Sequence, residues 1–276
     1  MPPQTWDYIA KIVSLGDSGC GKSSLTIRLC EGRFTNSHDV TIGVEFGSRI
    51  VPVGPPASLE LGINDPASTS RVQTAQTKGS KKPTKDESAD QKHMKLSLWD
   101  TAGQETYKSI TRSYFRGASG ALLVFDITRR ETFASVTSWL HDLRQIAEEG
   151  IIVVLVGNKS DLAPASMVGS GREEVNKRQV TREEAEDWCK LNKVMGYVET
   201  SAKSGAGVER AFLEVAERIY QNIEAGKYDL NDRRSGVKAA SVSGGGGATS
   251  NTSRTVNLTV RDDGPAKSKA AGGGCC

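Results

Sequence analysis

The sequence predicts an α/β fold with a mostly parallel, six-stranded sheet that is covered by helices on both faces. Two segments, ALLVFDI from Ala121 and IIVVLVG from Ile151, are continuously apolar, which is typical of strands buried on both faces of a parallel sheet. Between and after them, apolar residues recur at helical spacing. Near the N-terminus, a strand-like run from Tyr8 is followed by a glycine-rich turn and a helix start. Strands that alternate with helices indicate this layered architecture.

The composition is that of a soluble globular protein. Of the 276 residues, 37% are hydrophobic and 25% are charged, and the formal net charge of +3 is too small to indicate nucleic-acid binding. No apolar run approaches the roughly 18 residues of a membrane span and the N-terminus has no apolar leader, so we expect a cytosolic protein with reduced thiols. The five cysteines fit neither a disulfide framework nor a zinc site, and Cys275 and Cys276 stand apart at the end.

The first strand leads into a phosphate-binding loop. Gly16, Gly21, Lys22 and Ser23 match the pattern G-x-x-x-x-G-K-[ST]. Its glycines let successive backbone N–H groups point at phosphate oxygens, and the following helix adds the positive end of its dipole. Lys22 can then reach the β- and γ-phosphates, and Ser23 can offer its hydroxyl to Mg²⁺. The alternative is an ordinary Gly/Ser turn, which the strand before it and the amphipathic helix after it disfavour.

The next two strands carry a second part of this site. A helix is expected to end near Cys30, and a polar loop that contains Thr41 leads to an alternating strand from Val44 to Val53. The following strand, MKLSLWD, ends in Asp100. An acidic residue at the end of an apolar strand, after a phosphate loop, indicates a Walker B carboxylate that holds Mg²⁺.

Three stretches are expected to lie outside the regular fold. The segment 54–93 joins two strands of a hairpin, and its part 67–91 has almost nothing to bury, so we expect a disordered insertion and favour an inert one over a functional one. Residues 163–176 form a second loop expansion. The Gly- and Ser-rich sequence of 229–276 predicts a flexible tail, which leaves 1–228 as the folded domain.

The second half of the chain supplies the remaining elements. Thr181 and Glu184 make a capping box for a helix, a short strand is expected over 196–200, and a last helix carries apolar residues over 208–223. Ligands of open α/β sheets bind at the carboxyl ends of the strands, and the motifs of this chain all fall there.

Two further motifs favour guanine over other bases. In Asn158-Lys159-Ser160-Asp161, the Asp161 carboxylate can accept hydrogen bonds from the guanine N1–H and exocyclic amine, a donor pair that adenine lacks. In Thr200-Ser201-Ala202-Lys203, a backbone N–H can meet guanine O6 and the Lys203 stem can lie against the base. A carboxylate that the wrong base leaves buried and unpaired costs on the order of 1–3 kcal/mol.

With these motifs, the chain resembles a Rab, a small GTPase of the Ras superfamily with the P-loop NTPase fold. The resemblance covers roughly residues 6–223 and rests on GDSGCGKSS, TIGVEF, WDTAGQE, the stretch 109–133, N-K-x-D, SAK and the terminal Cys-Cys. HDVTIGVEFGSR and ITRSYFRGA resemble Rabs of early endosomes, recycling compartments and the Golgi. The insertion at 54–93 departs from the family pattern, next to the expected effector face, and leaves the partners open.

The resemblance implies a role for each matched residue. Gln104 would orient the water that attacks GTP, with Lys22 at the phosphates. Phe46, Trp99 and Tyr114 match the aromatic triad that meets effectors, although core packing is an equal alternative for each. Mg²⁺ would be held by Ser23, Thr41 and Asp100. GTP or GDP would contact Asp17, Ser18, Gly19, Cys20, Gly21, Lys22, Ser23, Ser24, Phe34, Thr41, Gly103, Asn158, Lys159, Asp161, Ser201, Ala202 and Lys203.

The resemblance also implies a GTP-hydrolysing switch that regulates vesicle traffic. Its partners would be an exchange factor, a GTPase-activating protein, a GDP-dissociation inhibitor, a Rab escort protein and trafficking effectors, and it would act as a monomer. Prenylation of Cys275 and Cys276 would tether it to the cytoplasmic face of endosomal or Golgi membranes, with a cytosolic pool. One alternative is a catalytically weak, GTP-dependent scaffold on these membranes. Another is a metabolic ATPase or kinase of the same fold, which the guanine motifs disfavour.

Overall fold

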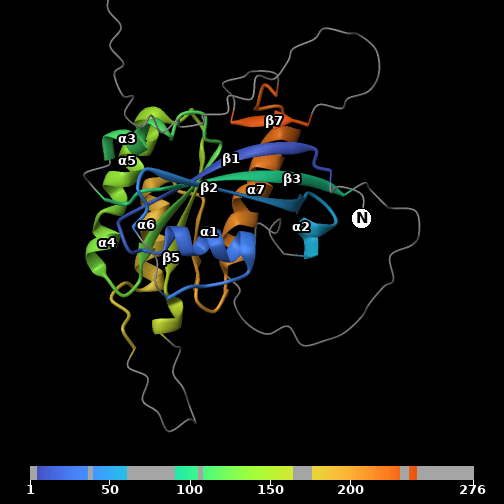
Figure 1. Cartoon of the computed structure of the whole chain (residues 1–276). Helices are drawn as coiled ribbons and strands as arrows, with labels where there is room; N and C mark the ends of the chain where they lie inside the picture. Colours follow the sequence, from blue (N-terminus) through green and yellow to red (C-terminus); the bar gives the residue numbers. More distant parts are fainter. Residues whose placement is uncertain are drawn as a thin grey trace, which may run out of the picture. The chain divides into compact units, whose positions relative to one another are not determined.

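Six strands form the centre of the computed structural model, in the order β2-β3-β1-β4-β5-β6. Figure 1 shows the chain with most of its helices and strands labelled. The structure describes residues 5–36, 40–60, 91–104, 108–163, 176–230 and 236–240. Only β2 runs antiparallel to its neighbour, β3, and the other pairings along this path are parallel. The strands are β1 (Tyr8–Leu15), β2 (Val44–Val53), β3 (Lys92–Thr101), β4 (Gly120–Asp126), β5 (Ile152–Asn158) and β6 (Gly196–Glu199). The predicted fold class is confirmed.

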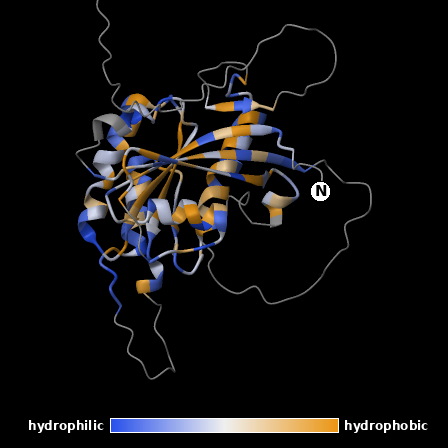
Figure 2. Cartoon of the chain, viewed as in Figure 1, coloured by the Kyte–Doolittle hydropathy of each residue, from blue (hydrophilic) through white to orange (hydrophobic). Residues whose placement is uncertain are grey.

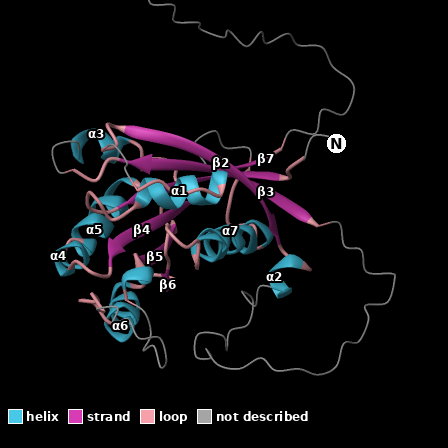
Figure 3. Ribbon diagram, turned by 60° about the horizontal axis from the view of Figure 1, so that its bottom comes forward, coloured by secondary structure: helices cyan, strands magenta, loops and turns pink. Residues whose placement is uncertain are grey.

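Helices cover both faces of this sheet, and Figure 3 shows them around the strands. The helices are α1 (Lys22–Glu31), α2 (Ala57–Glu60), α3 (Lys108–Ser113), α4 (Arg130–Ala134), α5 (Val136–Ile146), α6 (Arg182–Asn192) and α7 (Val208–Glu224). One half of the predicted capping box of α6 is present, because the Glu184 N–H donates to Thr181 Oγ1 at 3.2 Å, whereas the Glu184 carboxylate accepts from Arg130. Within the residues described, no helix combines the length and the apolar character that a membrane crossing needs.

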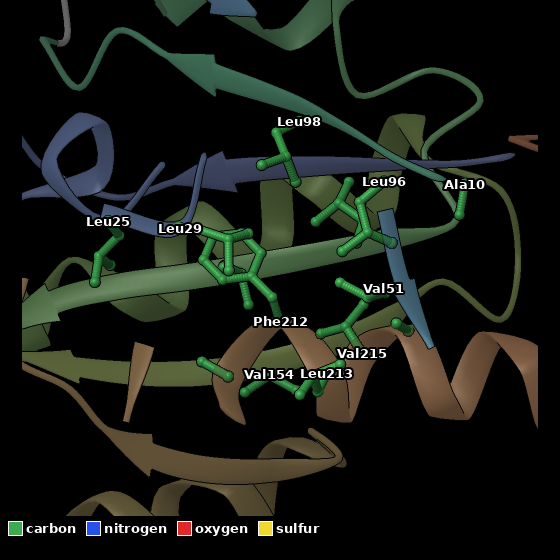
Figure 4. Packing of buried hydrophobic residues seen from close by; sticks show 14 of the residues in the cluster. Ala10, Leu25, Leu29, Val51, Leu96, Leu98, Val154, Phe212, Leu213 and Val215 are labelled. Carbon is green, nitrogen blue, oxygen red and sulfur yellow. The ribbon is translucent and has the colours of Figure 1, made fainter. Parts of the chain in front are cut away.

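Two hydrophobic clusters hold the helices to the sheet. One packs α1 and α7 against the sheet, with Phe212, Leu96 and Val154 among its fully buried residues (Figure 4). The other packs α5 and α6 on the opposite face around Phe125. In Figure 2, hydrophobic residues gather on the strands at the centre of the domain and on parts of the helices around them. Full burial of one such side chain contributes about 1.5–3 kcal/mol, so the clusters fix the strand ends that carry the motifs.

A seventh strand corrects the predicted start of the tail. β7 (Val237–Ala239) pairs antiparallel with residues 8–10 at the start of β1. β4 pairs with β1 only from Ile12 onward, so it leaves the start of β1 free for β7. Val237 is fully buried in the hydrophobic cluster that packs α1 and α7 against the sheet. The compact unit therefore extends to Ala240 instead of ending at residue 228. The rest of the predicted tail, including both terminal cysteines, lies outside the described residues.

The ends of the predicted insertion are folded. The Gln91 side chain donates to Val53 O at 2.8 Å and accepts from Ala57 N at 3.1 Å, which closes the base of the segment. The Gly54 N–H donates to the buried Glu217 carboxylate at 2.8 Å. Residues 54–60 and 91–93 thus belong to the domain, and residues 61–90 lie outside the described part of the chain, as do 164–175 of the second expansion.

The insertion leaves the sheet far from the effector-facing residues, contrary to the prediction. Phe46 pairs with Trp99, whereas Val53 pairs with Lys92, seven residues further along the hairpin. At about 3.4 Å per residue this is a separation of about 24 Å. Its root lies instead beside Asp7, which exchanges backbone hydrogen bonds with both His93 and Ala240. The described residues His93 and Ala240 therefore lie at the same end of the domain.

We expect that replacing residues 61–90 with a short glycine linker changes the melting temperature by only a few degrees and leaves GDP affinity unchanged. The deleted sequence has no apolar periodicity, and the cost of closing a loop changes by only about 0.6 kcal/mol per doubling of its length. A matched deletion of 61–91 also removes the Gln91 hydrogen bonds to Val53 and Ala57, so this variant should have a lower melting temperature. Differential scanning calorimetry checks both. A large loss of stability in the first variant would show that the removed segment packs on the domain.

Candidate functional site

A cavity of about 450 Å³ opens at the carboxyl ends of the strands. All but three of the predicted nucleotide contacts line it, and the exceptions are Asp17, Cys20 and Ser201. Cys20 and Ser201 are buried behind the loops that form the wall. The lining residues are Ser18, Gly19, Gly21, Lys22, Ser23, Ser24, Phe34, Thr35, Asn36, Val40, Thr41, Gly103, Asn158, Lys159, Asp161, Leu162, Ala202 and Lys203.

The phosphate end of the cavity is formed by the loop between β1 and α1. The Lys22 ammonium is 6% exposed and donates to Gly16 O at 2.8 Å and Asp17 O at 3.0 Å. Burial lowers the pKa of Lys22 below its ordinary value. A bound phosphate would place negative charge next to the ammonium and would therefore stabilise its charged form. Gly21 has φ +92°, and a Cβ there would lie 2.3 Å from Asn158 Nδ2, so the loop can approach Asn158 only with glycine.

Three predicted metal ligands converge beside Lys22. The Ser23 and Thr41 hydroxyl oxygens lie 2.9 Å apart, and Thr41 Oγ1 lies 3.5 Å from the Asp100 carboxylate. Two hydroxyls and a buried carboxylate are hard oxygen donors, the kind that Mg²⁺ binds together with phosphate oxygens, so these residues fit that ion. Gly103 lets the end of β3 approach this point, because a Cβ there would lie 2.4 Å from Lys22 Nζ.

The base end is built by the loops after β5 and β6. Asn158 is 1% exposed and links them to the phosphate loop: its Nδ2 donates to Cys20 O at 2.8 Å, while its Oδ1 accepts from Thr200 Oγ1 and Ala202 N at 3.2 Å each. The Ser201 hydroxyl donates to Asp161 Oδ1 at 2.6 Å. The buried Ser201 thus orients the carboxylate predicted to recognise guanine, rather than lining the cavity itself.

Three further residues that the sequence analysis did not assign hold this site from behind. Arg129 donates to Ser18 O at 2.8 Å, and Trp139 Nε1 donates to Asp17 Oδ1 at 2.7 Å. The buried Asp126 carboxylate accepts from Lys159 Nζ at 2.7 Å. Burial alone would raise the pKa of Asp126, but the hydrogen bonds from Lys159 and Thr128 hold it below its ordinary value. Asp126 ends an apolar strand as Asp100 does, and that signal was available in the sequence.

The three predicted effector residues form one continuous aromatic group. The Phe46 and Trp99 rings are 4.6 Å apart at 81°, and the Trp99 and Tyr114 rings are 5.8 Å apart at 48°. Phe46 is 65% exposed, which disfavours the alternative of core packing for this residue. Gln104 follows Gly103 directly and is partly exposed.

The family comparison agrees with this geometry. The model of the Ras family matches the chain in two segments, residues 11–77 and 68–221, which meet inside the predicted insertion. Together they span well over half of the chain and include the phosphate loop, the end of β3 and both guanine motifs. The chain therefore belongs to the Ras family and is a small GTPase, a switch protein that binds guanine nucleotides with Mg²⁺, hydrolyses GTP and responds to exchange factors and GTPase-activating proteins.

Proposed function

We propose that this small GTPase is a Rab that regulates vesicle traffic on endosomal or Golgi membranes. The observation that carries the proposal is the continuous aromatic group of Phe46, Trp99 and Tyr114, in which Phe46 is exposed and the other two rings are half-buried. Thr41 and Gly103 lie in the segments beside these aromatic residues, so a change at the γ-phosphate can alter the surface that an effector meets. The Rab-like motifs and the terminal Cys-Cys support the same assignment.

The proposed cycle has a slow intrinsic hydrolysis step. Arg129 lies beside the phosphate loop, but its guanidinium donates to Ser18 O and pairs with Asp126 at 3.4 Å. It is therefore engaged in holding the loop, and an arginine supplied by an activating protein would accelerate hydrolysis by roughly 10³–10⁵. GDP-dissociation inhibitor, escort protein and effectors complete the proposed set of partners. The membrane-bound form would carry GTP, and the cytosolic pool would carry GDP.

We expect the double variant Cys275→Ser/Cys276→Ser to bind GTP normally and to move wholly into the cytosol. Two prenyl chains give stable membrane attachment, whereas one chain binds only reversibly, because each buried CH₂ adds about 0.8 kcal/mol. Fractionation and imaging of the tagged full-length protein measure the change, with each single Cys→Ser variant as the matched intermediate. A double variant that stays on membranes would show that something other than the tail holds it there.

The same imaging tests the trafficking role. In the Gln104→Leu background, which should retain GTP, the protein with intact cysteines should accumulate on endosomes or Golgi. Accumulation on another membrane would contradict the proposed compartment, and a diffuse GTP-locked protein would contradict the Rab assignment.

A further inference from the structure

The loop between β6 and α7 is held on its carbonyl side by one arginine of α1. Arg28 Nε donates to Ala202 O at 2.8 Å, and Arg28 Nη2 donates to Lys203 O. Its third nitrogen, Nη1, donates to Gly32 O at 2.6 Å, just past the end of α1. A single guanidinium therefore ties two consecutive carbonyls of the predicted guanine loop to the helix that starts at the phosphate loop.

This contact lies opposite to the one made by Asn158. Asn158 Oδ1 accepts from Ala202 N on the N–H side of the loop, while Arg28 binds the carbonyl side. The arginine stem also packs on the loop, because a Cβ built at Gly205 would lie 3.8 Å from Arg28 Cδ. The loop around Ala202 is thus held by Asn158 of β5 on one side and by Arg28 of α1 on the other.

The chemistry suits an arginine at this position. Its planar guanidinium can donate in several fixed directions at once, whereas a lysine ammonium is a point charge on a flexible stem. The positive charge also lies at the carboxyl end of α1, where the helix dipole favours a cation. Because α1 begins with Lys22 and Ser23, Arg28 links the helix at the phosphate half of the cavity to the loop at its base half.

We propose that Arg28 is a positioning residue that slows nucleotide release by holding the loop of Ala202 and Lys203 against the guanine base. The proposal rests on the guanine-nucleotide binding of the family and not on the proposed trafficking role. It concerns the lifetime of the GDP-bound state, which limits how often the switch can be reset without an exchange factor.

The first test is the dissociation rate of a fluorescent GDP from the full-length protein with Mg²⁺. Arg28→Ala should release GDP about tenfold faster, because even one lost hydrogen bond to a charged group is worth about one order of magnitude. Arg28→Lys should fall between this variant and the wild type. Arg33→Ala is the matched control, since the only ion-pair partner of Arg33 among the described residues is Glu31 at the surface, and it should release GDP at the wild-type rate. Single-turnover GTP hydrolysis should be unchanged in the Arg33→Ala control.

A second measurement distinguishes positioning of the loop of Ala202 and Lys203 from a general loss of rigidity of the nucleotide site. The diphosphate of 2-aminopurine riboside lacks both the 6-oxygen that the loop is expected to meet and the N1–H that Asp161 is expected to bind. Arg28 contacts only the loop, so Arg28→Ala should accelerate release of this nucleotide much less than release of GDP. Equal acceleration for both nucleotides, or wild-type GDP release by a folded Arg28→Ala or Arg28→Lys variant, would overturn the proposal. A wild-type protein that holds the 2-aminopurine nucleotide as tightly as GDP would instead overturn the assignment of this loop to the base.

Discussion

Replacing Asp161 with asparagine should turn the protein from a guanine binder into a xanthine binder. The carboxylate accepts two hydrogen bonds, whereas an amide accepts one and donates one. Guanine then meets an amide donor with its own exocyclic amine, while xanthine offers a carbonyl at that position. Each unpaired buried polar group costs about 1–3 kcal/mol, so GDP affinity should fall by two orders of magnitude or more and XDP affinity should rise. Competition between the two diphosphates for a fluorescent nucleotide measures both changes.

The structure indicates that this substitution will not disturb the loop. Asp161 Oδ1 accepts from Ser201 Oγ at 2.6 Å, and the amide oxygen of asparagine can take the same bond. The matched control is Asp187→Asn, which makes the same chemical change on an exposed residue of α6 that pairs with Lys190. It should leave both affinities unchanged. If Asp161→Asn keeps the wild-type preference for GDP, a different residue recognises the base.

The parts of the site that could be predicted are those in which a local sequence pattern determines the backbone conformation. The glycine and lysine spacing after β1 identifies a phosphate loop because the loop's conformation requires those residues. Strands β4 and β5 are apolar up to their last residues, Asp126 and Asn158, because both of their faces are buried. Phe46, Trp99 and Tyr114 were recognised through their motifs, and the strand pairing of Phe46 with Trp99 then brings two of the rings together.

The rest could not be predicted because it depends on distant contacts. β7 has three residues with no apolar periodicity, and it is a strand only because β1 has a free edge before β4 begins. The Arg28 bond to Ala202 spans 174 residues and the Arg129 bond to Ser18 spans 111, and no spacing rule reaches that far. The direction of the insertion, in contrast, follows from strand length alone, since the turn of a long hairpin lies at the end opposite to Phe46.

Replacing Lys22 with alanine should weaken binding of GTP by at least about thirtyfold. The ammonium organises the loop through the Gly16 and Asp17 carbonyls and is positioned to reach the β- and γ-phosphates. Removal of one partner of a buried, hydrogen-bonded charge pair costs about 2–5 kcal/mol, which corresponds to a loss of affinity from about thirtyfold to several thousandfold.

Lys22→Arg should not rescue the Lys22→Ala variant, because even a Cβ at Gly103 would lie 2.4 Å from Lys22 Nζ and a larger head has no room. This behaviour would distinguish Lys22 from Arg28, where the conservative replacement is expected to recover part of the effect. Lys190→Ala is the matched control. It also removes a lysine side chain, but Lys190 lies on the exposed face of α6, away from the nucleotide site. Equilibrium titration with a fluorescent, non-hydrolysable GTP analogue and Mg²⁺ checks all three. Wild-type affinity in Lys22→Ala would show that the loop binds phosphate through its backbone alone.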